Sequence, residues 1–328
     1  MRVGLFPGQG IPARKVLSAL SGAEELGLAE EVLGWDLLRR VEVGARGKGT
    51  ALPTSVAQPA IFLAGVRAWR MRMREGATFD FFAGHSLGEY TALVAAGSMS
   101  VEDGLLAVAA RAEAMHEAGR RSPGAMAAVI GLEFEDAAAI AEEAGVEIAN
   151  DNAPGQVVLS GDEDRLATVA GAVGARGGRS VLLEVEGAFH TAAMAPAEPA
   201  LSAVLGGIEV MAPQVPVVCN VTARPYERAR DIKGFLLRQL TERVLWRESL
   251  IWLWRAGVSE HEDLGPGKVV AGLAQRTWQS LTRSEESTGQ GSTDRLGDRP
   301  VKEGHDRLGD RPVKEEEEEE EEEVSARV

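Results

Sequence analysis

A single serine stands between two glycines in the stretch GHSLG at residues 84–88, a spacing typical of a nucleophilic serine on a sharp turn. The G-x-S-x-G pattern describes a strand that bends into a helix, and a side chain at either glycine would collide with the bend. The bend exposes the oxygen of Ser86 and aims the free N–H groups of the helix at whatever binds there. The alternative is an ordinary glycine-rich turn with a solvated serine.

The flanking residues supply the strand and the helix that this turn requires. Residues 79–83 are an apolar, aromatic-rich run of strand type. Residues 89–96 have alanine and leucine at helical spacing, with Glu89 in the first turn, where the helix dipole favours negative charge. The local pattern therefore favours a nucleophile at Ser86.

A serine hydroxyl needs a base within hydrogen-bond reach before it can attack. Among the five histidines of the chain, His190 is the strongest candidate, because it follows the last strand of a predicted subdomain where the chain crosses back beside a cleft. A packed interfacial histidine is the alternative there. His85 adjoins the serine and is expected to pack rather than to catalyse, because neighbouring side chains diverge on the turn.

Three further positions could stabilise charge. Gln9 in FPGQG follows the first predicted strand, at the sheet edge where ligands bind in parallel α/β domains, so its amide and nearby N–H groups could stabilise an oxyanion. The backbone N–H of Leu87 would be the second donor. Arg111 follows an apolar run on a helix, and its guanidinium could hold a carboxylate through two parallel hydrogen bonds. The alternatives are that PGQG is simply a turn and that Arg111 is a solvated arginine at the end of its helix.

The order of predicted elements indicates how these residues are positioned. Strands alternate with helices over residues 1–123, which predicts a parallel sheet covered on both faces. Residues 124–188 follow the order β-α-β-β-α-β, the ferredoxin-like arrangement. We therefore predict a large α/β-hydrolase-like domain made of residues 1–123 and 189–282, with the small ferredoxin-like subdomain inserted between them.

Composition limits the partners and the location. The chain has 328 residues, a net charge of −15 and one cysteine, Cys219, so it cannot form an internal disulfide. It has no apolar run of about 18 residues to span a membrane. Its N-terminus lacks a signal-peptide pattern, so a cytoplasmic location is the default expectation. The net charge of the residues before the C-terminal segment is mildly acidic, which argues against nucleic-acid binding.

The C-terminal residues 283–328 differ from the rest. DRLGDRPVKE occurs at 294–303 and again at 306–315, and nine glutamates fill 315–323. Such a segment cannot bury enough apolar surface to offset its ordering entropy, so we predict that it is disordered. A low-complexity extension is the favoured interpretation, and an acidic interaction tail is the alternative.

Eight short motifs occur in the order seen in the malonyl-CoA:acyl-carrier-protein transacylases, a family that includes the acyltransferase domains of polyketide synthases. They are FPGQG at 6–10, QPAIF at 58–62, GHSLGEY at 84–90, the arginine helix at 111, NDNAPGQVVLSG at 150–161, GAFH at 187–190, PVVCNVTARP at 216–225 and DLGPGKVV at 263–270. The chain resembles this family over about residues 1–280. It departs where FPGQG continues as IPARKVL and where Ala112 follows the arginine, and neither change removes a catalytic group.

The resemblance implies a role for each catalytic candidate. Ser86 would form an acyl ester, His190 would act as general base and then as general acid, and Gln9 with the Leu87 backbone would form the oxyanion hole. Arg111 would pair with the free carboxylate of a malonyl group. The family has no acidic triad member, so a carbonyl from the segment near GPGK would orient the histidine.

The resemblance also implies residues that shape the pocket. Gln58 and Asn152 would support it. Phe189, in the Ala-Phe-His pattern that goes with malonyl in polyketide acyltransferases, would fill the space that an α-methyl group needs. Such a contact discriminates by only about 1–3 kcal/mol.

The reaction implied is ping-pong transfer of malonyl from malonyl-CoA to the phosphopantetheine thiol of an acyl carrier protein, without a cofactor or a metal. No ketosynthase or carrier segment is attached, which favours a free-standing enzyme of fatty-acid synthesis. The alternatives are a discrete acyltransferase that serves a polyketide synthase in trans, an acyl hydrolase, and a non-catalytic carrier-binding protein. An acidic carrier needs a basic patch, for which the four arginines of RAWRMRMR at 67–74 are a candidate; a plain solvated face is the alternative.

Overall fold

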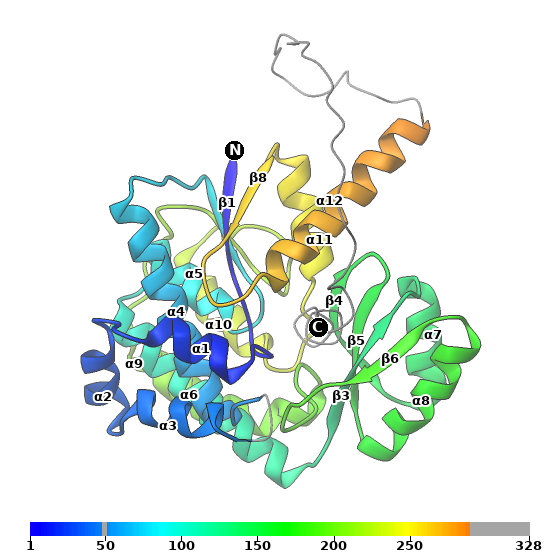
Figure 1. The fold of residues 1–328 in the computed structure, drawn as a ribbon, viewed down its shortest axis with the longest axis horizontal. Helices are drawn as coiled ribbons and strands as arrows, with labels where there is room; N and C mark the ends of the chain where they lie inside the picture. Colours follow the sequence, from blue (N-terminus) through cyan, green and yellow to red (C-terminus); the bar gives the residue numbers. More distant parts are fainter. Residues whose placement is uncertain (48–50, 289–328) are drawn as a thin grey trace, which may run out of the picture.

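A computed structural model describes residues 1–47 and 51–288, which form a larger and a smaller lobe (Figure 1). The larger lobe is built on a four-stranded sheet in the order β7-β2-β1-β8, and every neighbouring pair is parallel. Its strands are β1 (Arg2–Phe6), β2 (Phe81–Gly84), β7 (Val217–Val218) and β8 (Glu260–Asp263). The predicted parallel sheet is confirmed. Strand β8 was not expected, because its sequence EHED lacks the apolar residues that indicate a strand.

Helices cover both faces of this sheet. They are α1 (Ala13–Leu20), α2 (Leu26–Leu33), α3 (Leu37–Ala45), α4 (Thr54–Arg74), α5 (Gly88–Ala95), α6 (Val101–Arg121), the 3-10 helix η1 (Ala192–Ala197), α9 (Glu198–Gly207), α10 (Ala229–Arg238), α11 (Trp246–Arg255) and α12 (Val269–Thr288). The sequence did not predict helices α1, α2 and α3. Helix α1 is nevertheless amphipathic, since it buries Ala13, Val16 and Leu20 at helical spacing.

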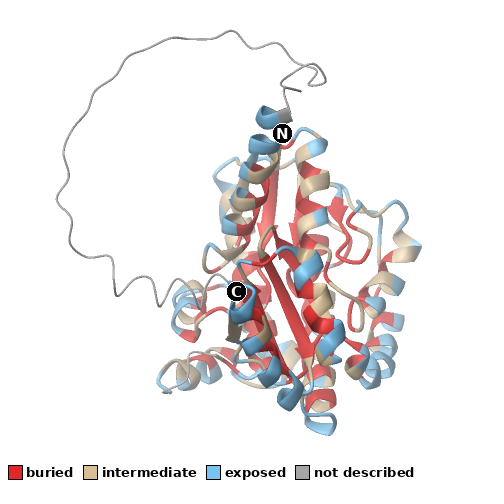
Figure 2. Ribbon diagram, turned by 90° about the vertical axis from the view of Figure 1, so that its right-hand side faces the viewer, coloured by how far each residue is buried: buried red, intermediate tan, exposed pale blue. Residues whose placement is uncertain are grey.

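Strands β1, β2 and β7 are largely buried on both faces (Figure 2), as parallel strands under two helical layers must be, whereas the edge strand β8 is partly exposed. Phe6 and Phe82 pack into the main core with helices α4 and α6. Val3 and Leu5 point the other way, into a second core that includes Trp246 of α11 and residues of α12. The sheet therefore sits between two apolar layers, and its carboxyl edge is free to carry functional loops.

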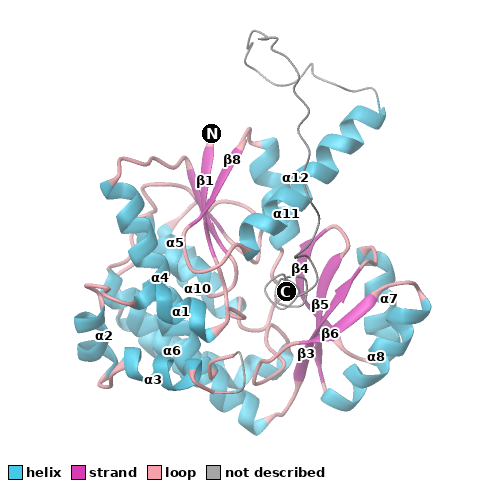
Figure 3. Cartoon of the chain, viewed as in Figure 1, coloured by secondary structure: helices cyan, strands magenta, loops and turns pink. Residues whose placement is uncertain are grey.

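The smaller lobe has the ferredoxin-like order that the sequence predicted. Its elements are β3 (Ala125–Ile130), α7 (Phe134–Ala144), β4 (Glu147–Ala153), β5 (Gln156–Gly161), α8 (Glu163–Ala175) and β6 (Arg179–Leu182). The strands form an antiparallel sheet in the order β4-β5-β3-β6, with α7 and α8 on the side away from the larger lobe (Figure 3). The opposite face contributes Met126, Ala128 and Val158 to the main core, so the two lobes share apolar packing.

The C-terminal prediction needs one correction. Residues 283–288 continue α12 as a helix instead of being disordered, because they extend a helix whose earlier residues are packed into the second core. Residues 289–328 lie outside the described part of the chain, so the prediction for them stays a prediction. None of the helices within residues 1–47 and 51–288 has the length and apolar content that a membrane span requires.

Strand β4 joins the smaller lobe to the segment that leads into α11. The backbone N–H of Asp151 donates to the carbonyl of Val244 at 3.0 Å, and the N–H of Val244 donates to the carbonyl of Ala149 at 2.9 Å. The carboxylate of Asp151 also pairs with the guanidinium of Arg247 at 2.9 Å, and that guanidinium lies over the ring of Phe134. These contacts fix the smaller lobe against the larger one.

We predict that Asp151→Ala lowers the free energy of unfolding by about 1–3 kcal/mol, because it leaves the partly buried Arg247 without its carboxylate. Chemical denaturation followed by circular dichroism measures the change. The control is Asp164→Ala in the exposed first turn of α8, which should change stability by about 0.5 kcal/mol or less. Equal stability of the two variants would contradict a structural role for the Asp151 ion pair.

Candidate active site

Ser86 occupies the tight bend between β2 and α5. Its φ is 50°, in the left-handed region that a residue with a side chain seldom adopts. A Cβ at Gly84 would overlap the backbone of Gly88, and a Cβ at Gly88 would overlap the carbonyl of Phe6 on β1. Both glycines are therefore required by close backbone approach, as the spacing indicated.

Asn220, in the loop after β7, stabilises this bend through hydrogen bonds to its backbone. Its side-chain oxygen accepts a hydrogen bond from the N–H of Ser86 at 2.7 Å, and its side-chain nitrogen donates to the carbonyl of Gly84 at 2.7 Å. The asparagine lies within the PVVCNVTARP motif, but nothing in the motif indicated that it would clamp the serine. It stabilises the strained backbone that presents the hydroxyl.

The structure brings Ser86 and His190 together from positions far apart in the sequence. Ser86 Oγ lies 2.8 Å from His190 Nε2, and His190 Nδ1 lies 2.7 Å from the backbone carbonyl of Gln239. Because a carbonyl only accepts, Nδ1 carries the proton, and Nε2 is left to accept from the serine hydroxyl. The side chains thus form a dyad oriented by a backbone carbonyl.

The orienting carbonyl corrects one expectation from the sequence. It belongs to Gln239, which caps the C-terminal end of α10, and not to the segment near GPGK at 265–268. The last carbonyls of a helix have no partner within the helix, so Gln239 can accept from the imidazole. The GPGK loop instead packs on the FPGQG loop, where Gly265 lies against Pro7.

The surroundings of His190 keep its imidazole neutral. Burial, followed by the positive charge of Arg111, lowers the pKa of His190 to about 3. The ring is therefore unprotonated at ordinary pH and can accept the serine proton. A neutral histidine is what a general base requires before the first step.

Arg111 is a buried cation with polar but uncharged contacts. Its guanidinium donates to Gln58 Oε1 at 2.7 Å, to Ser86 Oγ at 2.9 Å and to Gln239 Oε1 at 3.0 Å, and the side chain is almost fully buried. Within the described ranges no carboxylate forms an ion pair with it. A desolvated charge with no carboxylate in direct contact is costly, so this position is suited to an anionic group brought in by a ligand.

Gln9 and Leu87 contribute backbone rather than side-chain donors. The side-chain amide of Gln9 donates to Thr54 Oγ1 at 3.0 Å and does not hydrogen-bond to the serine. The backbone N–H groups of Gln9 and Leu87 have no acceptor among the described residues. Two free N–H groups on the loops that flank Ser86 fit an oxyanion hole.

Asn152 and His85 form a supporting pair. Asn152 Oδ1 lies 2.8 Å from His85 Nε2, and the imidazole of His85 packs edge-on against the ring of Trp246. His85 therefore packs, as expected. Asn150, and not Asn152, lines the cavity at Ser86, so Asn152 acts on the pocket through His85.

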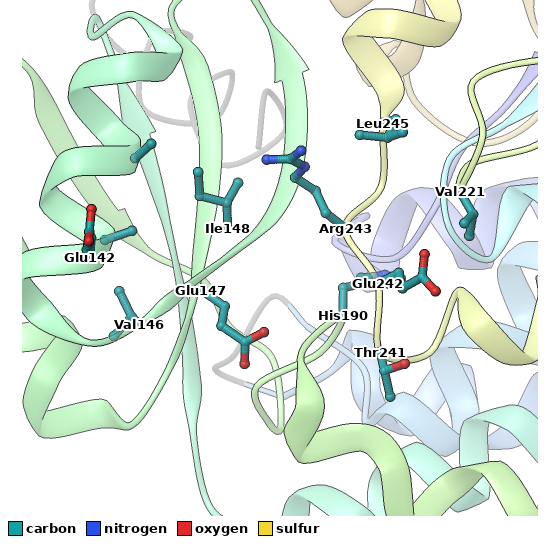
Figure 4. A pocket seen from close by; sticks show the side chains of 12 residues that line it. Glu142, Val146, Glu147, Ile148, His190, Val221, Thr241, Glu242, Arg243 and Leu245 are labelled. Atoms are coloured by element: carbon teal, nitrogen blue, oxygen red, sulfur yellow. The ribbon is translucent and has the colours of Figure 1, made fainter.

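The dyad opens into a cavity of about 290 Å³ between the two lobes. Its polar lining includes Ser86, Arg111, Gln58 and Glu184, and Phe189 is among its apolar lining residues. A second cavity, of about 520 Å³, also reaches His190 and is lined by residues of α7, of β4 and of the segment 241–245. Figure 4 shows it between the strand that carries Glu147 and Ile148 and the segment from Thr241 to Leu245.

The four arginines at 67–74 have local partners and do not form a free basic patch. Arg67 donates to the carbonyls of Ala19 and Ser21, Arg70 pairs with Glu25, Arg72 with Glu75 and Glu262, and Arg74 with Glu24. Carboxylates offset the charge of Arg70, Arg72 and Arg74, and the guanidinium of Arg67 is occupied by carbonyls, which argues against this helix as the docking surface for an acidic partner.

Comparison with known proteins places these residues in a family. The acyl transferase domain family matches residues 15–251. The malonyl CoA-acyl carrier protein transacylase of Bacillus subtilis is 37% identical over 84% of this chain and 90% of its own length, and that of Escherichia coli is 36% identical over 85% and 94%. A solved complex of a type II polyketide synthase acyl-carrier protein with its malonyl-transacylase is 35% identical, with a TM-score of 0.77 over 85% of this chain and 93% of that one.

We predict that Gly88→Ala destabilises the protein by about 3 kcal/mol and removes the reactivity of Ser86, because the new methyl group overlaps the Phe6 carbonyl. The control is Gly234→Ala in α10, where the added methyl meets open space and should raise stability by about 0.5–1 kcal/mol. Thermal unfolding and labelling by a serine-directed fluorophosphonate measure both effects. Normal labelling of Gly88→Ala would show that the bend tolerates a side chain.

Proposed function

This chain belongs to the acyl transferase family that contains the malonyl-CoA:acyl-carrier-protein transacylases, and we propose that it transfers the malonyl group of malonyl-CoA to the phosphopantetheine thiol of an acyl carrier protein. The observation that carries the proposal is the position of Arg111. Its guanidinium contacts Ser86 Oγ and has no carboxylate partner in the described structure. An acyl group on Ser86 with a free carboxylate at its far end would supply that partner.

The first half-reaction uses the dyad. Ser86 Oγ attacks the thioester carbonyl while His190 Nε2 takes the hydroxyl proton, and the backbone N–H groups of Gln9 and Leu87 stabilise the oxyanion. The tetrahedral intermediate collapses as the C–S bond breaks, and His190 returns its proton to the departing CoA thiol. The product is a malonyl ester on Ser86.

The second half-reaction reverses these steps with a different thiol. The phosphopantetheine thiol of the carrier gives its proton to His190 and attacks the ester, and Ser86 leaves with that proton as a free hydroxyl. One thioester is consumed and one is formed, so the reaction balances without a cofactor. The enzyme must mainly keep water from the acyl ester, which fits a serine placed in an inter-lobe cavity.

Two residues would set the choice of acyl group. Arg111 favours malonyl over acetyl, because an acetyl group leaves the buried guanidinium without an anion. Phe189 lines the same cavity, and its ring is expected to disfavour an α-methyl substituent. The first effect is electrostatic and the second is steric.

We assign the activity to fatty-acid synthesis in the cytoplasm, where the unpaired, buried Cys219 would stay reduced. The second candidate is supply of malonyl units to a polyketide synthase, which is favoured by the similarity to the transacylase solved with a polyketide carrier protein. Transfer assays with fatty-acid and polyketide carrier proteins distinguish the two pathways.

Ser86→Ala should take up no label from radioactive malonyl-CoA, because the ester has no other oxygen to form on. Acid-quenched, gel-separated protein measures the covalent label. Ser202→Ala, on the exposed side of α9, is the matched control and should label like the wild type. Label retained on Ser86→Ala would mean that the nucleophile is wrongly assigned.

Arg111→Ala should lower kcat/KM for malonyl-CoA about 100-fold or more, because the malonyl carboxylate loses its buried cation. Acetyl-CoA should be affected less, so the ratio of the two specificity constants falls. Arg111→Lys keeps the charge but loses the paired donors and should lie between the wild type and the alanine variant. An unaltered malonyl preference in Arg111→Ala would refute the carboxylate clamp.

A further inference from the structure

We infer that Glu89 is a positioning residue that fixes the side-chain amide of Gln239 and, through it, the guanidinium of Arg111. This inference rests on the proposed malonyl transfer and concerns how its carboxylate clamp is held. Glu89 lies three residues after Ser86, in the first turn of α5, and its side chain is almost fully buried. It does not line the cavity, so it acts only through other residues.

Both carboxylate oxygens of Glu89 accept hydrogen bonds. One oxygen accepts from the hydroxyl of Tyr226 at 2.6 Å and from the backbone N–H of Asn220 at 3.1 Å. The other accepts from the side-chain amide nitrogen of Gln239. A carboxylate is therefore required, because an amide of the same size accepts at one end only and would set a donor against a donor at the other.

The Gln239 amide connects Glu89 to the catalytic groups. Its nitrogen also donates to the carbonyl of Ser86 at 3.0 Å, and its oxygen accepts from the guanidinium of Arg111 at 3.0 Å. The orientation of the amide therefore decides whether an acceptor or a donor faces Arg111. Glu89 holds the orientation in which the acceptor faces the cation.

The electrostatics support the same assignment. Glu89 and Arg111 are buried opposite charges that are separated by one amide, so each lowers the cost of burying the other. Burial raises the pKa of Glu89 to about 7, against the opposing effect of its hydrogen-bond donors. A protonated Glu89 must donate, and its proton would displace one of those donors.

Other ionisable groups around Glu89 do not change charge near that pH. Burial raises the pKa of Cys219 to about 12 and also raises those of Tyr90 and Tyr226, so all three stay protonated. The two histidines of the site, His85 and His190, have pKa values lowered by burial and stay neutral, and Arg111 stays cationic. Asp263 on β8 is a second carboxyl whose pKa burial raises to about 7, so an acid limb near pH 7 is assigned to Glu89 by its absence in Glu89→Gln.

The test compares Glu89→Gln with Tyr226→Phe in the full-length chain, with malonyl-CoA and a purified holo carrier protein as substrates. Glu89→Gln should raise KM for malonyl-CoA about tenfold or more, while kcat changes by about threefold or less. Tyr226→Phe removes a donor to Glu89 that does not contact Gln239, so its KM should stay close to wild type. The wild-type kcat/KM should fall as the pH drops through about 7, and Glu89→Gln should lack that limb.

Three results would overturn the positioning role. The first is a Glu89→Gln variant with wild-type KM and pH profile, and the second is a Tyr226→Phe variant with an equal loss. The third needs no variant and applies if Glu89→Gln does not fold: a wild-type profile that is flat between about pH 6 and about pH 8. A wild-type chain that transfers no malonyl refutes the proposed function instead, so the two failures are distinguishable.

Discussion

The burial of an arginine without a carboxylate partner is the constraint on which the rest of the site depends. Arg111 is held by the side-chain oxygens of Gln58 and Gln239 and by the nucleophile itself. These groups orient the guanidinium without neutralising it, so its charge remains available to a ligand. The same charge helps to keep His190 unprotonated, so one residue serves both recognition and the reactivity of the base.

Gln239 connects these functions. Its backbone carbonyl orients His190, and its side chain contacts Arg111 and the backbone of Ser86. Base, clamp and nucleophile therefore depend on where α10 ends. A displacement of that helix end would move all three together, which explains why the adjoining segment is fixed to β4 by backbone hydrogen bonds and by the Arg247–Asp151 ion pair.

The sequence predicted the parts of the site that depend on local pattern. The glycine spacing around Ser86 specified a bend, and the position of His190 at a crossover between lobes indicated a cleft. Gln239 could not be predicted, because its carbonyl belongs to the backbone and the segment RQLTERV around it has no catalytic signature. Strand β8 was missed for a related reason: its polar residues are held by pairing with β1 and not by an apolar pattern.

Ser86 and His190 share a backbone feature, since both have a positive φ, 50° and 58°. Each such residue costs about 1–3 kcal/mol relative to a relaxed conformation, and glycine at either position would relieve that cost. The reactive pair thus opposes the stability of the fold that carries it. A lineage freed from the need for catalysis would be expected to lose these two side chains early and to become more thermostable as it did so.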